Sequence, residues 1–188
     1  MYLLIDIGNT RIKWQQRDEK NIISSGSVLV ENFMDIDLTE IKLLKKVIVS
    51  NVNHSIVLDK VKENLIHFDC PIIEVISESN EELINDYTDQ STLGVDRWLA
   101  AMGAWKIYGE DVIVINAGTA ITIDLIQIDQ KRKAHFRGGM ILPGIAISLG
   151  ILNNSTNLID TEIGQNQYPS LNTKDAVTTG ILTSIQGA

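Results

Sequence analysis

The sequence predicts an α/β fold in which a β-β-β-α unit occurs twice. The first observation is the order of the segments. An apolar run, a glycine turn, an alternating strand and a third strand occur near the N-terminus and again in the second half. The second observation is an internal sequence similarity: INAGTAITID at 115–124 is similar to IDIGNTRIKW at 5–14. A period this long excludes a solenoid and predicts two halves, 1–109 and 110–188, each with a central mixed sheet.

The elements of the first half follow from the hydrophobic period. Branched and alternating residues predict a three-strand meander, after which helices and strands alternate, and this implies crossovers and parallel pairing. Ser55 is expected to cap the second helix. The expected strands cover 2–8, 11–17, 21–30, 46–52 and 71–77, and the expected helices cover 39–46 and 55–66.

The segment between the repeats is polar and then strongly apolar. Residues 79–93 lack a clear period and predict a short helix and a loop, and a connection this long is often functional. Residues 94–109 predict a helix whose Trp98, Met102 and Trp105 form one core-facing stripe. In the second half we expect strands at 111–118, 119–127 and 133–139, and helices at 143–154 and 173–186.

Composition limits the classes of function. The net charge is −8 and the pI is about 4.8, which argues against nucleic acid as a partner, because phosphate backbones are bound by clustered Lys and Arg. The single cysteine, Cys70, allows no intrachain disulfide and fits a reducing cytoplasm. The first apolar run is short and is interrupted by Asp6, so we expect neither a signal peptide nor a membrane span.

Two glycine turns after buried strands are candidate phosphate-binding loops. Gly8, Asn9 and Thr10 form the first, and Gly118 and Thr119 form the second. Glycine lets the backbone approach a ligand closely, and neighbouring hydroxyls and amides can bind phosphate oxygens. Each turn alone is more typical of a simple hairpin than of a ligand site. Two copies at matching places in a duplicated unit favour a nucleotide held between the halves, although no Walker or dinucleotide-binding motif is present.

Charged residues around the first turn extend this hypothesis. Asp6 ends an apolar strand, where it either caps the turn through Thr10 or a backbone N–H, or serves as a direct or outer-sphere ligand of the Mg²⁺ that accompanies ATP. Lys13 shares one side of the next strand with Arg11 and could reach phosphate. An exposed strand lysine is the equally good alternative.

Four motifs together resemble the type III pantothenate kinase family. They are DIGNTRIKW (6–14), LGVDRW (93–98), NAGTAITID (116–124) and GGMILPG (138–144), and NTKDAVTTGI (172–181) resembles the next helix of the family. The resemblance implies a duplicated actin-like (ribonuclease H-like) ATPase fold. It also implies ATP-dependent phosphorylation of pantothenate, the first step toward coenzyme A, by a cytoplasmic homodimer. The implied cofactors are Mg²⁺ and a monovalent cation, K⁺ or NH₄⁺.

The resemblance also implies roles for individual residues. Asp96 is similar to the general base of the family. Arg97 is similar to a family residue that binds the pantothenate carboxylate through two hydrogen bonds or stabilises the transferred phosphate. The implied substrate-binding residues are Tyr87, Gly94, Val95, Asp96, Arg97 and Thr173, the last contributed across the dimer interface. The expected ATP-binding residues are Asp6, Gly8, Asn9, Thr10, Arg11, Lys13, Gly118 and Thr119. We expect Gly138, Gly139 and Gly144 to shape the turn and the helix entry around the cleft.

The sequence departs from the family pattern at Asn116, where the family has an Asp at the cation site. An amide keeps one carbonyl oxygen but loses the negative charge, so the change leaves three outcomes: full activity, weaker cation and nucleotide affinity, or lost catalysis. Because Asp6 and Asp96 are retained, the first two are favoured. Asp124 could compensate, although on its strand we expect it to face solvent.

A second departure is that the family continues past the SIQGA at 184–188 with further elements that contact adenosine. Either the sequence is a fragment, which we expect, or its nucleotide site is incomplete. Two other functions remain open. A regulatory relative would bind ATP without transferring phosphate. An actin-like ATP hydrolase would need no small-molecule acceptor, although the Asp96–Arg97 pair favours one.

Overall fold

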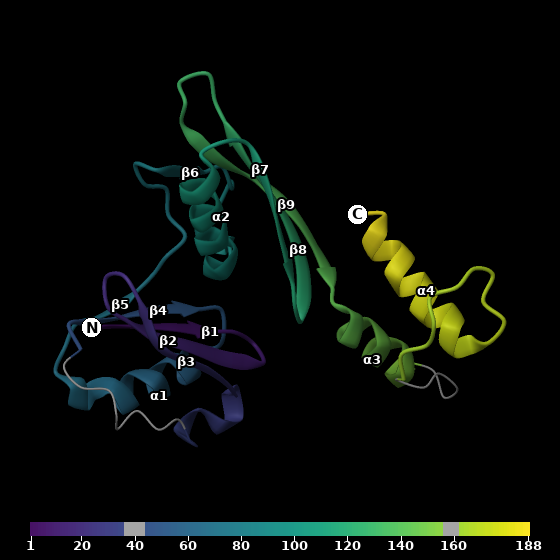
Figure 1. The fold of residues 1–188 in the computed structure, drawn as a ribbon, viewed down its shortest axis with the longest axis horizontal. Coiled ribbons are helices and arrows are strands. Elements are labelled where there is room, and N and C mark those ends of the chain that lie inside the picture. Colours follow the sequence, from purple (N-terminus) through teal and green to yellow (C-terminus); the bar gives the residue numbers. More distant parts are fainter. Residues whose placement is uncertain (36–43, 156–161) are drawn as a thin grey trace.

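The computed structural model describes residues 1–35, 44–155 and 162–188, and shows two sheets and a helical arm (Figure 1). The strands are β1 (Tyr2–Ile7), β2 (Arg11–Arg17), β3 (Ile22–Leu29), β4 (Lys46–Asn51), β5 (Ile72–Glu74), β6 (Leu83–Asn85), β7 (Val112–Ala117), β8 (Ala120–Ile128) and β9 (Ala134–Pro143). The α-helices are α1 (Ser55–Leu65), α2 (Val95–Tyr108), α3 (Ile145–Ser155) and α4 (Thr173–Gln186). Short 3-10 helices cover Val30–Asp35, Ile66–Phe68 and Gln90–Thr92.

The first sheet has the strand order β3-β2-β1-β4-β5. β1, β2 and β3 form the expected antiparallel meander, and β4 and β5 add in parallel, as the crossovers predicted. Leu3, Ile5 and Ile7 alternate onto one buried face and pack in one core with Leu58 and Val61 of α1. The predicted α/β class with a mixed sheet in this half is therefore confirmed.

Two predictions for helices of the first half are not confirmed. The helix expected at 39–46 falls mostly on 36–43, outside the described residues. The prediction that Ser55 caps α1 is wrong: the helix begins at Ser55, and its N-cap is His54, whose side chain makes no capping hydrogen bond. His54 has the extended backbone that an N-cap needs, so the helix starts one residue earlier than the cap rule suggested.

The second sheet has the order β6-β9-β8-β7 and repeats the meander in β7, β8 and β9. This confirms the duplicated unit. The segment 79–93 contains a short helix, as expected, in the form of the 3-10 helix Gln90–Thr92, but it also contains the strand Leu83–Asn85, which was not expected and pairs in parallel with β9. Leu83 and Asn85 are both buried, which is the alternation expected of a strand. A three-residue strand among polar neighbours is too short for this alternation to be recognised in the sequence.

Helix α2 lies between the two sheets. It packs against β7, β8 and β9 of the second sheet and also against β4 of the first. The predicted stripe is confirmed, since Trp98 is buried and both Met102 and Trp105 pack against the same core. The chain passes from the first sheet to the second between β5 and β6, so β6 and α2 precede the expected boundary at Gly109 but pack with the second sheet.

Helices α3 and α4 form an arm that continues from the end of β9 and lies apart from the first sheet (Figure 1). The two helices pack against each other. Within the described part of the chain, no helix has both the length and the apolar character needed to cross a bilayer.

Candidate active site between the two halves

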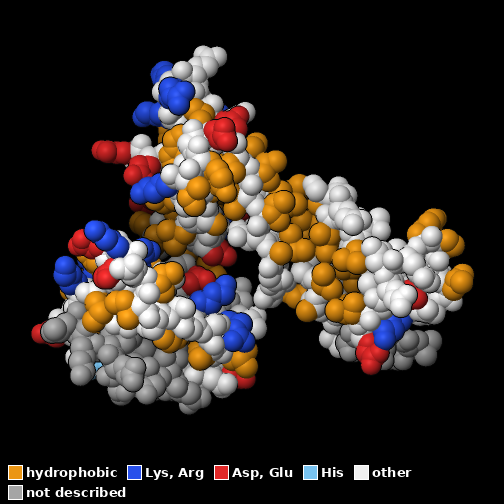
Figure 2. Space-filling model, in the orientation of Figure 1, with side chains coloured by type: hydrophobic (Ala, Val, Ile, Leu, Met, Phe, Trp, Pro, Cys, Tyr) orange, Lys and Arg blue, Asp and Glu red, His pale blue; other side chains and the backbone are white. Residues whose placement is uncertain are grey.

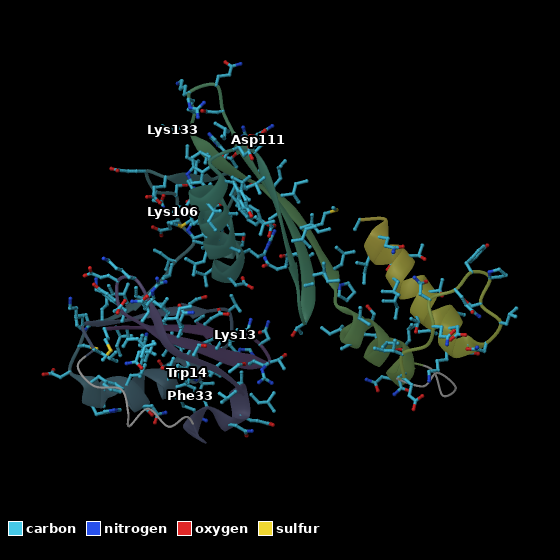
Figure 3. All side chains as sticks on the ribbon, viewed as in Figure 1. Lys13, Trp14, Phe33, Lys106, Asp111 and Lys133 are labelled. Atoms are coloured by element: carbon cyan, nitrogen blue, oxygen red, sulfur yellow. The ribbon has the colours of Figure 1, made fainter. Side chains whose placement is uncertain are left out.

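A cleft of about 1120 Å³ lies between the sheets and is lined from both of them. Figure 2 shows charged side chains of both signs where the halves face each other. Neighbouring residues of β2 point to opposite faces of the first sheet: Trp14 packs against the core that includes Phe33, whereas Lys13 lines the cleft (Figure 3). The cleft therefore uses the sheet face that α1 does not cover.

The two glycine turns meet at this cleft. Each turn is closed by a backbone hydrogen bond, from Gly8 N to the Arg11 oxygen and from Gly118 N to the Ala120 oxygen, both 3.0 Å. The hydroxyl oxygens of Thr10 and Thr119, 109 residues apart in the chain, are 3.2 Å from each other. The structure thus brings together the residues that the sequence proposed from two separate repeats.

Other residues support the two turns. Asn53 Nδ2 donates to the Gly8 oxygen at 2.9 Å, and Gly144 N donates to the Thr119 oxygen at 3.0 Å. A Cβ on Gly144 would lie 2.3 Å from the Gly118 oxygen, so only glycine fits there. Sequence reasoning missed Asn53, although polar residues just after a parallel strand, here β4, are a known signal of a ligand site.

Asp6 lies at the carboxyl end of β1 and lines the cleft. Its Oδ1 accepts a hydrogen bond from Ser50 Oγ at 3.1 Å, and its Oδ2 is 4.0 Å from Lys13 Nζ. Arg11 does not itself line the cleft, but its Nε donates at 2.7 Å to the Oγ of Ser27 on β3, which does. The first turn therefore offers a carboxylate and one nearby cation to the cleft.

Asp96 lies in the first turn of α2 and faces the cleft. Its Oδ1 accepts the backbone N–H of Arg97 at 2.8 Å, so the side chain folds back over the start of the helix. A Cβ on Gly94 would lie 2.6 Å from this oxygen, so a larger residue there would displace the Asp96 carboxylate from this position. Val95 is buried in the core and presents no side chain to the cleft.

Arg97 and Asp124 form a buried ion pair beside Asp96. Arg97 Nε donates to both carboxylate oxygens of Asp124, at 3.1 and 3.2 Å, and Nη2 donates to Oδ1. Nη1 donates to the Tyr87 hydroxyl at 3.0 Å. Burial lowers the pKa of Arg97, but the bonds to Asp124 and Tyr87 outweigh burial and leave the pKa above its ordinary value. The expectation that Asp124 faces solvent is wrong, since it is 1% exposed.

The remaining predicted residues lie at two places. Asn116 lines the cleft, and its Nδ2 is 3.3 Å from Thr122 Oγ1, to which it donates. Thr173 is exposed at the start of α4, on the helical arm and away from the cleft (Figure 1). The fold of one chain therefore does not bring Thr173 to the cleft.

A second carboxylate cluster fixes the segment that carries Tyr87. Asp86 accepts from Arg137 Nη1 at 2.7 Å, and its oxygens lie 3.0 and 3.1 Å from His135 Nδ1. Partial burial raises the pKa of Asp86, but the hydrogen bonds to His135 and Arg137 outweigh it and hold the pKa below its ordinary value. The cluster ties this segment to β9.

We expect Asp86→Asn to lower the free energy of unfolding by about 1 kcal/mol at pH 7. A lowered native pKa means that the contribution of Asp86 is present above the unfolded-state pKa and is lost as the pH falls through the native one. Urea unfolding of both proteins at pH 7 and pH 3 measures this. A destabilisation of equal size at both pH values would contradict it.

Comparison with known proteins assigns the family. The model of the type III pantothenate kinase family matches residues 2–188. The chain belongs to this family. The type III pantothenate kinase of Methylobacillus flagellatus is 33% identical over 193 residues, which cover 99% of this chain and 74% of that protein. The type III pantothenate kinase of Dechloromonas aromatica is 33% identical over 192 residues, which cover 100% and 79%.

A solved structure agrees with this assignment of the fold. A protein from Campylobacter jejuni, described as a candidate Baf family transcriptional activator, has a TM-score of 0.58 and 25% identity over 98% of this chain and 75% of that one. The actin-like fold that the type III pantothenate kinase motifs implied is confirmed.

Proposed function

We propose that the chain phosphorylates pantothenate with ATP, to give 4′-phosphopantothenate, in the cleft between its halves. The observation that carries this proposal is the meeting of the two glycine turns at Thr10 and Thr119, with Asp96 lining the same cleft. Backbone N–H groups and hydroxyls from both turns suit the phosphates of ATP. Asp96 suits the alcohol of pantothenate, which needs orientation and an acceptor for its proton.

Asp6 and Asn116 fit the two cations that the family implies. Mg²⁺ is usually held by one or two carboxylates together with phosphate oxygens, and Asp6 supplies one half-exposed carboxylate at the cleft. The amide nitrogen of Asn116 donates a hydrogen bond to the Thr122 hydroxyl, so its carbonyl oxygen is the atom suited to a monovalent cation. When bound, such ions would neutralise charge that develops on the transferred phosphate.

Thr173 supports a homodimer as the working form. It starts a helix on an arm that lies away from the cleft, so a role in binding pantothenate requires the arm of a second copy. We place the enzyme in the cytoplasm, as expected for a chain with one cysteine.

A coupled ADP-release assay on the natural protein, with and without pantothenate, tests the proposal. ADP release that depends on pantothenate supports it. ATP binding without such release would instead identify a regulatory relative, and equal release without pantothenate would identify an ATP hydrolase.

We expect Asn116→Asp to lower the K⁺ concentration needed for half-maximal activity roughly tenfold, because a carboxylate adds a full negative charge at the proposed cation site. The measurement is ADP release against K⁺ at constant ionic strength. Asp111→Asn, which changes a charge at the far end of the same β7 hairpin, is the control and should leave the K⁺ dependence unchanged. An unchanged K⁺ dependence in Asn116→Asp would contradict the assignment.

A further inference from the structure

Asn53 connects the end of β4 to the first glycine turn. Its Nδ2 donates to two successive carbonyl oxygens of that turn, those of Gly8 at 2.9 Å and Asn9 at 3.4 Å. An amide nitrogen carries two hydrogens, so these two bonds use both of them. The Oδ1 of Asn53 accepts the backbone N–H of His54 at 2.7 Å, and this fixes the orientation of the amide, because only its oxygen can accept.

The backbone that carries Asn53 is itself held at both neighbouring strands. The backbone N–H of Asn53 donates to Asn51 Oδ1 at 3.0 Å, and Asn51 Nδ2 donates to the Asn53 carbonyl oxygen at 3.3 Å. The N–H of Val52 donates to the carbonyl oxygen of Ile7, the last residue of β1, at 3.0 Å. The connection between β4 and α1 is therefore fixed without the Asn53 side chain.

The bonds from Asn53 set the direction of the peptide groups in the turn. These peptides are trans, and in a planar trans peptide the N–H points opposite to the C=O. Because Asn53 holds the carbonyls of Gly8 and Asn9, the N–H groups of Asn9 and Thr10 point away from it. Neither N–H donates to any residue that the structure describes, and Gly8 and Asn9 line the cleft. Adjacent N–H groups of this kind suit phosphate oxygens.

We propose that Asn53 is a positioning residue for the phosphates of ATP. It does not line the cleft. It holds the carbonyls of the first glycine turn so that the N–H groups of Asn9 and Thr10 remain free to donate to phosphate. This inference rests on the proposed function, and it gives the connection between β4 and α1 a part in nucleotide binding that lies outside both glycine turns.

The same connection also borders the start of α2, which allows the two substrates to be separated. Val52 lines the cleft together with Asp96, and a Cβ on Gly94 would lie 3.9 Å from Val52 Cγ1. Because the bonds from Asn51 and to Ile7 hold this backbone, loss of the Asn53 side chain should loosen the glycine turn and leave Val52 against α2. The effect should therefore fall on ATP and spare the acceptor.

Titration calorimetry with AMP-PNP, a non-hydrolysable ATP analogue, in Mg²⁺, together with steady-state ADP release, tests the inference. Asn53→Ala should raise the Kd for AMP-PNP and the KM for ATP roughly tenfold, because two carbonyls lose their donor. The KM for pantothenate should stay within about twofold. If Asn53→Ala cannot be purified, Asn53→Asp, which keeps the size and the acceptor but loses the donor, should show the same split between the two substrates.

Asn64→Ala is the matched control. Asn64 Nδ2, on α1, also donates to a backbone carbonyl oxygen, that of Lys60 at 3.0 Å, and Asn64 does not line the cleft. The substitution removes the same kind of bond and should leave the Kd for AMP-PNP and both KM values within about twofold.

The two measurements separate failure of the inference from failure of the proposed function. A Kd for AMP-PNP that changes less than about twofold in Asn53→Ala, or an equal rise in both KM values, would overturn the inference and leave the proposed function standing. A natural protein that releases no ADP in response to pantothenate would overturn the proposed function, while the AMP-PNP titration would still decide the inference. A natural protein that binds no AMP-PNP would overturn both.

Discussion

Asp96→Asn is expected to lower kcat by about 10²- to 10⁴-fold, the usual contribution of a general base. The amide is nearly the same size and can still accept the Arg97 N–H, so the start of α2 should keep its shape. What it cannot do is take the proton of the attacking alcohol. The KM values for ATP and pantothenate should therefore change little, and coupled ADP release at saturating substrates measures the loss.

Asp89→Asn is the control for this experiment. Asp89 lies on the segment that leads to α2, where its carboxylate accepts from Ser91 N and Oγ, and it does not line the cleft. The substitution removes one negative charge, as Asp96→Asn does, but at a residue outside the proposed site, so kcat should stay within about twofold. A kcat for Asp96→Asn within tenfold of the natural enzyme would refute its role as the base.

Gly139→Ala is expected to lower the free energy of unfolding by about 3 kcal/mol. The new Cβ would lie 2.1 Å from the Ile123 oxygen and 2.4 Å from Asp124 Oδ1. The first of these is a backbone atom inside the β8–β9 ladder, so the strand itself would have to move. Urea unfolding monitored by tryptophan fluorescence measures the change.

Gly103→Ala provides the opposite case. A Cβ there meets nothing within 4 Å, and the residue lies inside α2, where alanine is favoured over glycine. This substitution should raise the free energy of unfolding by up to about 1 kcal/mol. Equal midpoints for Gly139→Ala and the natural protein would show that β8 and β9 do not approach as closely as the structure has them.

The sequence predicted those elements that are long enough for their hydrophobic pattern to repeat. The paired meanders, α1, α2 and the meeting of the glycine turns all follow from patterns that span six or more residues. The strand at Leu83–Asn85 is too short to have a period, and its partner β9 lies about 50 residues away.

The burial of Asp124 escaped prediction for a different reason. Both faces of β8 carry apolar residues, so alternation alone could not decide which face is the core. Thr122, Asp124 and Ile126 share the face that is buried, while Leu125 on the other face is 40% exposed. Arg97, the partner that makes burial possible, lies 27 residues away on α2, and no local pattern connects the two.

The contact between Thr10 and Thr119 is one of the contacts that join the two halves, beside the packing of α2 against β4. A neutral hydrogen bond between exposed hydroxyls contributes about 1 kcal/mol, which corresponds to roughly a fivefold preference between two conformations. Phosphate oxygens that bind both turns at once would then shift the ensemble toward closure, so the binding of ATP and the approach of the two halves become one equilibrium.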